Sequence, residues 1–447
     1  MMIPIFLFFL LSSIFTVEAQ QGQSIVKPGS ILTPTTNSSW LSPSGLYAFG
    51  FYKQGNGYAV GVFLAGIPQK TVVWTANRDN PPVSAQVTLN FTSDGRLVLQ
   101  SAQGTETSLA NFDPASSASM LDTGNFVVYN SDNQPIWESF QNPTDTLLPT
   151  QRLLPNDSVV LKSSVSESNQ STGRFRAIMQ QDGYVALYPV GTNLTIDYGY
   201  WSTNSGIPHG NLNLDDHGFL YVTNSSFNFT LSPSRNSAKG TVLYRLRMED
   251  DGFLRLYSYN LQEQNGSWSI IWSPLNETGV NRCFPRGVCG VNAYCDPGGN
   301  DINCTCLPGF VFIDESKRTL GCQRNSTTEN CNEKGMMEEV PNIIWENVTY
   351  SQSLLPTKQD CDDACLQDCS CEAALFNDRV CRKQKLPLRF VNIKLPIDSD
   401  ATLAFIKVRT PTPSEPTPSS EGTVTKKKGL DTLFLCYFLF SYALPLL

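Results

Sequence analysis

The stretch WESFQNPTDTLLPTQ, from Trp137 to Gln151, indicates the end of one β module and the start of the next. Proline fixes φ and has no N–H, so a strand cannot continue through Asn142-Pro143. The residues Pro143-Thr144-Asp145-Thr146 are typical of a hydrogen-bonded turn, whose hydroxyl and carboxylate groups we expect to cap backbone donors. The apolar side chains expected to bury this corner are Trp137, Phe140, Leu147 and Leu148.

The composition favours several small domains made of short strands. The chain has 447 residues, which is too many for one core. Only 16% of them are charged, while 31 glycines and 28 prolines supply many turns. The net charge of −8 argues against a nucleic-acid partner bound through its phosphates.

The N-terminus indicates export from the cell. Residues 1–19 form an apolar run that ends in Val17-Glu18-Ala19, the small-x-small pattern of a signal-peptide cleavage site. Asn-x-Ser/Thr acceptor sites for N-glycans follow along the rest of the chain. The predicted glycosylation sites are Asn37, Asn90, Asn156, Asn169, Asn193, Asn224, Asn228, Asn265, Asn276, Asn303, Asn325 and Asn347.

The cysteines are concentrated in one region. Of the 13 cysteines, none precedes Cys283, twelve lie between Cys283 and Cys381, and Cys436 lies in the apolar tail. Such a cluster after a signal peptide predicts disulfides rather than a metal site. The two histidines, His209 and His217, lie outside the cluster, and we expect neither a metal ion nor a cofactor.

Five similar units, each an acidic-Gly turn followed by a short apolar strand, recur before the cysteines. Their turns lie at Asp94, Asp122, Asp182, Asp216 and Asp251, with spacings of 28 residues within the first pair and 34 and 35 within the last three. Such turns suit tight hairpins, and a repeat of this kind indicates a repeat-built β architecture. Gly55-Asn56-Gly57 is likewise predicted to be a hairpin turn. Composition alone does not separate a β-prism from a β-sandwich.

Two strings carry a family resemblance: WESFQNPTDTLLPTQ and, at residues 72–82, VVWTANRDNPP. Both resemble the extracellular region of plant G-type (bulb-type) lectin S-receptor-like kinases. The resemblance implies a mainly β chain with two tandem bulb-lectin β-prism domains (22–150 and 151–278). A disulfide-rich EGF-like module (279–325) and an α+β PAN/apple domain (326–410) are expected next. Since the sequence carries none of the kinase motifs, we expect the kinase domain to be absent.

The cysteine spacing resembles two known modules. The string CTCLPGF at 304–310 resembles an EGF-like module, which implies the pairs Cys283–Cys295, Cys289–Cys304 and Cys306–Cys322. Farther along, two cysteines one helical turn apart predict a short helix, and AALF at 373–376 predicts a strand. The resemblance to a PAN/apple domain implies the pairs Cys361–Cys381 and Cys365–Cys371, leaving Cys331–Cys369.

The C-terminal end allows three interpretations. Residues 411–428 form a Pro/Ser/Thr linker and basic spacer, and 429–447 form an apolar tail. The tail is interpreted as a GPI-type anchor signal, a short membrane segment, or the remnant of a truncated membrane span. Each interpretation places the protein in the secretory pathway, outside the cell or on the plasma-membrane surface.

The resemblance also implies a sugar site. Bulb lectins bind mannose through Q-x-D-x-N-x-V-x-Y, whose alternate side chains point to one face of a strand. The third repeat keeps most of this motif, with Tyr184 and Ala186 in place of Asn and Val. Its candidate residues are Gln180, Asp182, Tyr184 and Tyr188.

The other repeats match less well. In the second, one extra residue displaces Asp122, and a bulge would be needed to restore its face. Its candidates are Asp122, Asn125, Val127 and Tyr129, while the first repeat keeps only Asp94 and Val98. We expect the third repeat to be the best site and the second the next best. The competing interpretation is purely structural, since Asp-Gly is a preferred hairpin turn. Trp40, Trp201 and Trp268 are similarly interpreted as core aromatics.

Two functional hypotheses follow. The first is recognition of mannose-type glycans or glycoproteins without catalysis, because no nucleophile, general base or metal pair is visible. The second is a degenerate lectin that acts as a decoy or co-receptor of full-length receptor-like kinases, bound through the EGF/PAN half.

Overall fold

The computed structural model describes residues 25–156, 159–233, 240–263, 266–274, 281–298, 301–325, 335–393 and 402–409. The predicted signal peptide, the linker and the apolar tail lie outside these residues, as do Cys331, Asn265 and Asn276. The described part is mainly β, and it has no helix long and apolar enough to cross a membrane.

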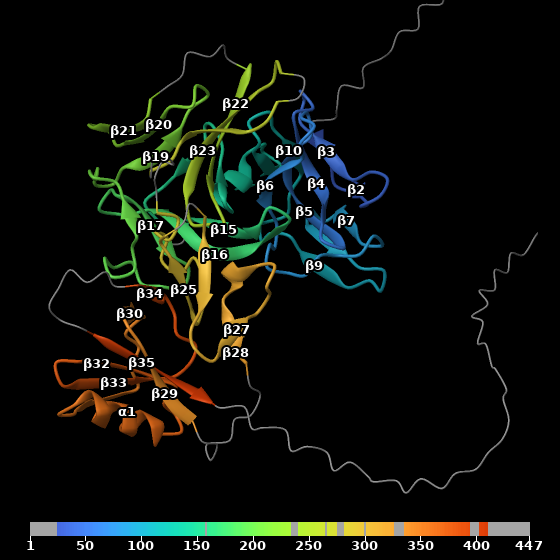
Figure 1. Ribbon diagram of the computed structural model, residues 1–447. Helices are drawn as coiled ribbons and strands as arrows, with labels where there is room; N and C mark the ends of the chain where they lie inside the picture. The colour runs from blue at the N-terminus through green and yellow to red at the C-terminus, as the bar shows by residue number, and fades with distance from the viewer. Residues whose placement is uncertain are drawn as a thin grey trace, which may run out of the picture. The chain divides into compact units, whose positions relative to one another are not determined.

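The first domain consists of three four-stranded antiparallel sheets (Figure 1). One sheet has the order β1 (Ile25–Val26), β10 (Ser117–Met120), β11 (Phe126–Tyr129) and β12 (Pro135–Glu138). The next has the order β2 (Ile31–Leu32), β7 (Thr88–Phe91), β8 (Leu97–Gln100) and β9 (Glu106–Ser108). The third has the order β3 (Ser39–Leu41), β4 (Tyr47–Gln54), β5 (Gly57–Leu64) and β6 (Thr71–Thr75). Their inward faces share one core, in which the rings of Phe49 and Phe126 stack with centroids 3.7 Å apart.

The second domain repeats this three-sheet plan. One sheet has the order β13 (Thr146–Leu147), β22 (Val242–Met248), β23 (Leu254–Asn260) and β24 (Ser269–Trp272). The next has the order β14 (Arg152–Leu153), β19 (Asn211–Leu214), β20 (Leu220–Thr223) and β21 (Asn228–Ser232). The remaining sheet has the order β15 (Leu161–Ser166), β16 (Asn169–Met179), β17 (Val185–Pro189) and β18 (Trp201–Ser202). Three small sheets around one core form a β-prism, so the prism rather than the sandwich is correct.

Each of the five predicted units forms a hairpin, joining β7 to β8, β10 to β11, β16 to β17, β19 to β20 and β22 to β23. Gly183 shows why the turn needs glycine: its φ is +93°, a conformation that side chains with a Cβ rarely adopt. The predicted turn at Gly55-Asn56 is also confirmed, because it joins β4 to β5 with Gln54 opposite Gly57.

The stretch from Trp137 to Gln151, called the joint below, divides Leu147 and Leu148 between the cores of the two domains. Leu147, on β13, is buried in the core of the second domain, and Leu148 is buried in that of the first. Successive side chains of an extended backbone point in opposite directions, so one dipeptide serves both cores. Gln151 fixes this geometry, since its Oε1 accepts from Leu148 N at 3.0 Å and its Nε2 donates to Phe140 O at 2.9 Å.

Asp145 corrects one expectation. Its buried carboxylate accepts from Arg247 Nε at 3.1 Å, and not from a backbone N–H as expected for a turn residue. Arg247 also pairs with Glu249 at 3.0 Å and donates to Ser164 Oγ at 2.8 Å. The joint is therefore held by a buried cluster of charged side chains.

The cysteine-rich segment (residues 281–325) consists of short paired strands that disulfides hold together. These are β25 (Ala293–Asp296) with β26 (Asn303–Cys306), and β27 (Phe310–Phe312) with β28 (Cys322–Arg324), with a 3₁₀ turn at Arg318–Leu320. The structure contains the disulfides Cys283–Cys295, Cys289–Cys304 and Cys306–Cys322, the same pairs that the family resemblance implies.

The C-terminal domain (residues 335–409) has one sheet of order β29 (Gly335–Val340), β35 (Leu403–Arg409), β32 (Ala373–Asn377), β33 (Val380–Gln384) and β31 (Ser351–Leu354). A smaller pair consists of β30 (Ile343–Ile344) and β34 (Asn392–Ile393). The predicted helix and the strand at AALF are both present, as α1 (Lys358–Leu366) and β32. Thr357 and Asp360 form a capping box that begins α1, which lies along the sheet (Figure 1).

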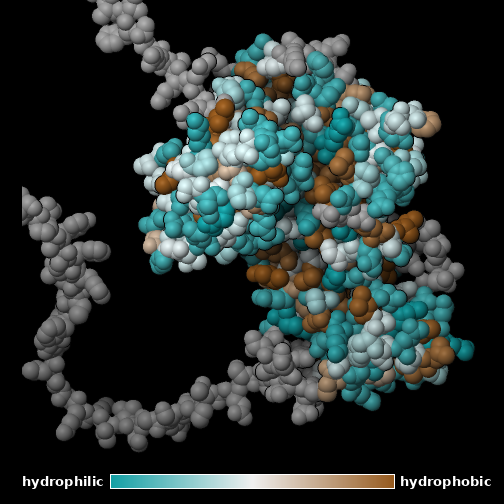
Figure 2. Space-filling view, turned by 180° about the vertical axis from the view of Figure 1, so that it is seen from behind, coloured by the Kyte–Doolittle hydropathy of each residue, from teal (hydrophilic) through white to brown (hydrophobic). Residues whose placement is uncertain are grey.

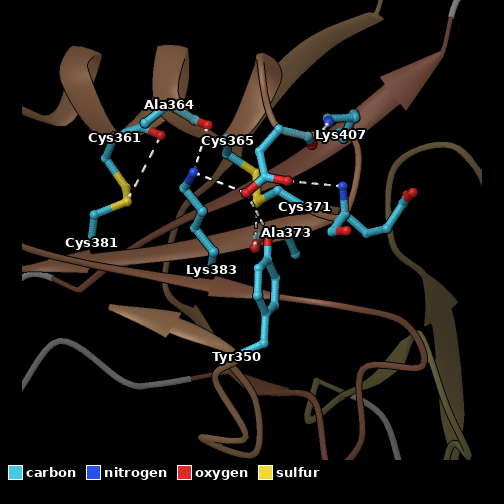
Figure 3. The surroundings of a disulfide bond; sticks show 12 residues. Tyr350, Cys361, Ala364, Cys365, Cys371, Ala373, Cys381, Lys383 and Lys407 are labelled. Atoms are coloured by element: carbon cyan, nitrogen blue, oxygen red, sulfur yellow. Dashed lines mark hydrogen bonds and ion pairs between the residues drawn. A yellow bond between two sulfur atoms is a disulfide. The ribbon is translucent and has the colours of Figure 1, made fainter. Parts of the chain in front are cut away.

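Disulfides and one lysine attach α1 to the sheet. Figure 3 shows Cys361–Cys381 and Cys365–Cys371, which are both implied pairs. Lys383, on β33, donates to Ala364 O at 2.8 Å and to Asp368 Oδ2 at 3.1 Å. Cys369 is also disulfide-bonded, and Cys331, its implied partner, lies outside the described residues.

Candidate carbohydrate-binding site

The third repeat presents alternate side chains on the outer face of its sheet. Val185 and Leu187 point into the core of the second domain, so Ala186 and Tyr188 point the other way. The turn that joins β16 to β17 brings Gln180, Asp182 and Tyr184 to the same side as these two residues. Backbone hydrogen bonds from Gly183 N to Gln180 O (3.0 Å) and from Gln180 N to Tyr184 O (2.9 Å) hold the turn.

All five alternating residues line one hollow of about 460 Å³. The rest of the wall of the hollow is formed by β18 and the segment that precedes it. Together they contribute Leu194, Ile196, Gly199, Tyr200, Trp201 and Ser202. Ile196 is 93% exposed and Tyr184 is 36% exposed, so both apolar side chains are accessible to a ligand.

The polar groups of the hollow are already positioned. Gln180 Nε2 donates to Tyr188 Oη at 3.2 Å, and Asp182 Oδ1 accepts from Tyr184 N at 3.3 Å. Burial raises the pKa of Tyr188, with the Gln180 hydrogen bond acting in the opposite direction, so the phenol stays protonated at neutral pH. An amide, a carboxylate and a phenol thus offer donors and acceptors to adjacent sugar hydroxyls.

The second repeat uses its polar residues within the fold. Asn125 is buried, donates to Glu138 Oε2 at 2.8 Å and accepts from Ser139 Oγ at 3.0 Å and from Phe140 N at 3.1 Å. Asp122 accepts from the backbone N–H (3.0 Å) and the hydroxyl of Ser44. Both groups therefore fix the joint and a neighbouring turn.

The other residues predicted in the first two repeats lie apart from the hollow. Val127 and Val98 are buried, and Tyr129 is half-buried at the end of β11. Asp94 is exposed and forms an ion pair with Arg96 at 2.8 Å. The structure therefore brings together only the candidates of the third repeat.

Comparisons with known proteins agree with this architecture. Residues 71–168 match the D-mannose binding lectin family, and residues 198–313 match the S-locus glycoprotein domain. The chain is 32% identical over 407 residues to the G-type lectin S-receptor-like serine/threonine-protein kinase LECRK2 of Oryza sativa subsp. japonica, covering 84% of this chain and 50% of that protein. The chain is a homologue of the G-type lectin S-receptor-like kinases.

Two further relatives support this relationship. LECRK4 of Oryza sativa subsp. indica, another G-type lectin S-receptor-like kinase, is 33% identical over 417 residues, covering 86% of this chain and 51% of that protein. A G-type lectin S-receptor-like kinase of Arabidopsis thaliana is 29% identical over 390 residues, covering 76% of this chain and 43% of that protein. The chain spans about half the length of these relatives, and the part it matches carries their lectin-type region.

One solved structure aligns with about half of this chain. The fetuin-binding Scilla campanulata agglutinin, a two-domain lectin, aligns with 55% of this chain and 99% of its own. Sequence identity is 17% and the TM-score is 0.21.

Some residues that line the hollow were not predicted. Trp201, interpreted as a core aromatic, packs against the core of the second domain and also lines the hollow. Ile196 and Tyr200 carry no motif, and only the pairing of β18 with β17 brings their segment to the site. Within the described part, no group of His, Cys, Asp and Glu side chains is arranged to hold a metal ion.

Most described acceptor asparagines are exposed: Asn37, Asn156, Asn193, Asn228, Asn303, Asn325 and Asn347. The other three are partly buried and have amide hydrogen bonds. Asn90 donates to Gln100, Asn169 accepts from Ser171 N, and Asn224 donates to Pro208 O. Glycosylation at all twelve sites stays a prediction.

Proposed function

We propose that this ectodomain binds mannose-type glycans or glycoproteins, without catalysis, at the hollow of the third repeat. The observation that carries the proposal is that all five motif positions of this repeat line one open hollow. In the second repeat, by contrast, the motif residue Asn125 is buried and hydrogen-bonded to Glu138 and Ser139.

The hollow suits a sugar chemically. Asp182 and Gln180 lie where they can accept from and donate to neighbouring hydroxyls, and Tyr188 holds the Gln180 amide in place. Tyr184 stands where the motif has asparagine and offers a ring face in place of an amide. Carbon-bound hydrogens of a sugar pack well against such a ring, so this substitution changes the site without closing it.

Calorimetric titration of the secreted protein with methyl α-mannoside tests the proposal. We expect saturable heat from the natural chain and a loss of roughly 1–3 kcal/mol in Asp182→Ala and Gln180→Ala, or about 5- to 150-fold in Kd. The matched control is Asp94→Ala, because Asp94 occupies the same motif position in the first repeat but lies outside the hollow. Binding that survives both variants would place the sugar elsewhere.

A second candidate function rests on a different observation. Nine of the eighteen exposed large hydrophobic side chains in the described residues lie between Phe284 and Leu366, including Leu354 at 80% exposure and Val348. Figure 2 shows hydrophobic patches on a largely hydrophilic face. Such residues suit a protein partner, and we propose a full-length receptor-like kinase as the alternative.

Sedimentation with the purified ectodomain of a full-length homologue tests this alternative. A complex that weakens in Leu354→Asp, from a sample that gives no heat with mannoside, would support the protein-binding role over the sugar-binding role. Sedimentation of the two ectodomains as separate species would exclude it.

A further inference from the structure

A second hollow adjoins the candidate sugar site. Its volume is about 400 Å³, and it is lined by residues of the second domain, the cysteine-rich segment and the C-terminal domain. The residues used below are Tyr200, Phe284, Arg286 and Asn392. Gly199 and Tyr200 line both hollows, so the two share a wall.

We propose that the two hollows are subsites of one groove and that the ligand is a mannose-type oligosaccharide rather than a single sugar. This inference rests on the proposed function, since the first subsite is the hollow of the third repeat. The second subsite would bind the sugars that follow along the oligosaccharide.

The second hollow has the chemistry of a sugar subsite. Phe284 is 43% exposed and offers an apolar ring to the carbon-bound hydrogens of a sugar. Arg286 has five N–H donors and uses one of them, Nη1, for the carbonyl of Asp197. Asn392 is exposed, and its Oδ1 accepts from Ile393 N, which leaves the amide NH₂ for a hydroxyl.

The wall between the subsites is rigid. Tyr200 Oη donates to Gly252 O at 2.8 Å, and the Tyr200 ring packs edge-on against Phe175 (centroids 6.0 Å apart) and Phe284 (6.5 Å). The disulfide Cys283–Cys295 contributes both of its cysteines to the second hollow. Subsites at a fixed separation bind a ligand that spans them without a further cost of ordering the protein.

The test is calorimetry on the full chain with methyl α-mannoside, mannotriose and mannopentaose. For the natural protein we expect mannopentaose to bind at least about tenfold more tightly than the monosaccharide. Phe284→Ala should keep the affinity for the monosaccharide. It should lose most of the increase in affinity that the natural protein shows for the longer oligosaccharides. The matched control is Phe227→Ala, another exposed phenylalanine (68%) that lines neither hollow and should keep the full gain.

Arg286→Gln gives a second, independent test of the second subsite. It should also reduce the increase in affinity with oligosaccharide length. A gain that persists unchanged in both Phe284→Ala and Arg286→Gln would arise from the number of terminal mannoses and would overturn this inference. Equal affinity for all three sugars would also overturn it, while leaving the proposed function intact. A lack of binding to any of them would overturn the proposed function and this inference together.

Discussion

At the scale of single residues, equivalent motif positions perform different tasks. Asn125 and Asp122 match the mannose motif in type, yet both are engaged within the protein. Asp145 has the appearance of a turn residue but neutralises a buried arginine. The residue type limits what a side chain can bind, and its neighbours in space decide what it does bind.

The buried cluster at the joint supports a prediction about stability. Arg247→Met should destabilise the protein by about 3–5 kcal/mol, because it removes the arginine that pairs directly with buried Asp145 and Glu249. Urea unfolding measures the loss. The control is Arg96→Met, which removes an exposed ion pair and should cost less than about 1 kcal/mol. Equal effects of the two variants would contradict a structural role for the buried cluster.

At the scale of elements, the hairpin is the repeating unit, and its turn supports both the fold and the site. Gly183 joins β16 to β17 directly beside the candidate sugar-binding residues. A Cβ at this position would lie 2.1 Å from the backbone of Ile207, so the turn packs too closely for any other residue.

Gly183→Ala should therefore destabilise the second domain by about 3 kcal/mol or more and abolish mannoside binding. Gly191→Ala is the matched control, since Gly191 also has a positive φ (+76°), but a Cβ added there would meet no atom within 4 Å. It should cost only about 1–2 kcal/mol from backbone strain. Thermal unfolding and calorimetry measure both effects, and similar values for the two variants would refute the steric argument.

At the scale of the whole molecule, the second domain, the cysteine-rich segment and the C-terminal domain share one hydrophobic core. The cluster of buried residues that contains Phe175 and Leu246 also includes Cys289, Trp345 and Leu388. Arg174 reinforces this connection, because its Nη1 donates to Gly287 O at 3.1 Å and to Thr319 O at 2.6 Å. This connection also places the second hollow beside the first.

Arg174→Ala should destabilise the protein by roughly 1–3 kcal/mol, because the two carbonyls lose a charged donor in a partly buried setting. Urea unfolding should show the loss. Arg152→Ala, which removes an exposed arginine of the same domain, should change the stability by less than about 0.5 kcal/mol. An unchanged midpoint for Arg174→Ala would show that this contact contributes nothing.

Much of the architecture could be predicted from local sequence. Acidic-Gly turns followed by apolar strands predicted the hairpins, and two cysteines one helical turn apart, Cys361 and Cys365, predicted α1. The third repeat could be ranked first because Gln180, Asp182 and Tyr188 keep the alternation of a strand face. The second hollow could not be predicted, since Phe284 and Tyr200 are 84 residues apart and carry no shared motif.

The turns, the strand alternation and the clustering of cysteines could be predicted from sequence, because they depend on neighbouring residues along the chain. Which polar side chains remain available to a ligand depends on the folded protein. Asn125 meets Glu138 and Ser139 and is buried, whereas Gln180 faces a hollow completed by a distant segment. The physical reason is that hydrogen bonding and burial depend on contacts between segments that are far apart in the sequence and meet only in the folded protein.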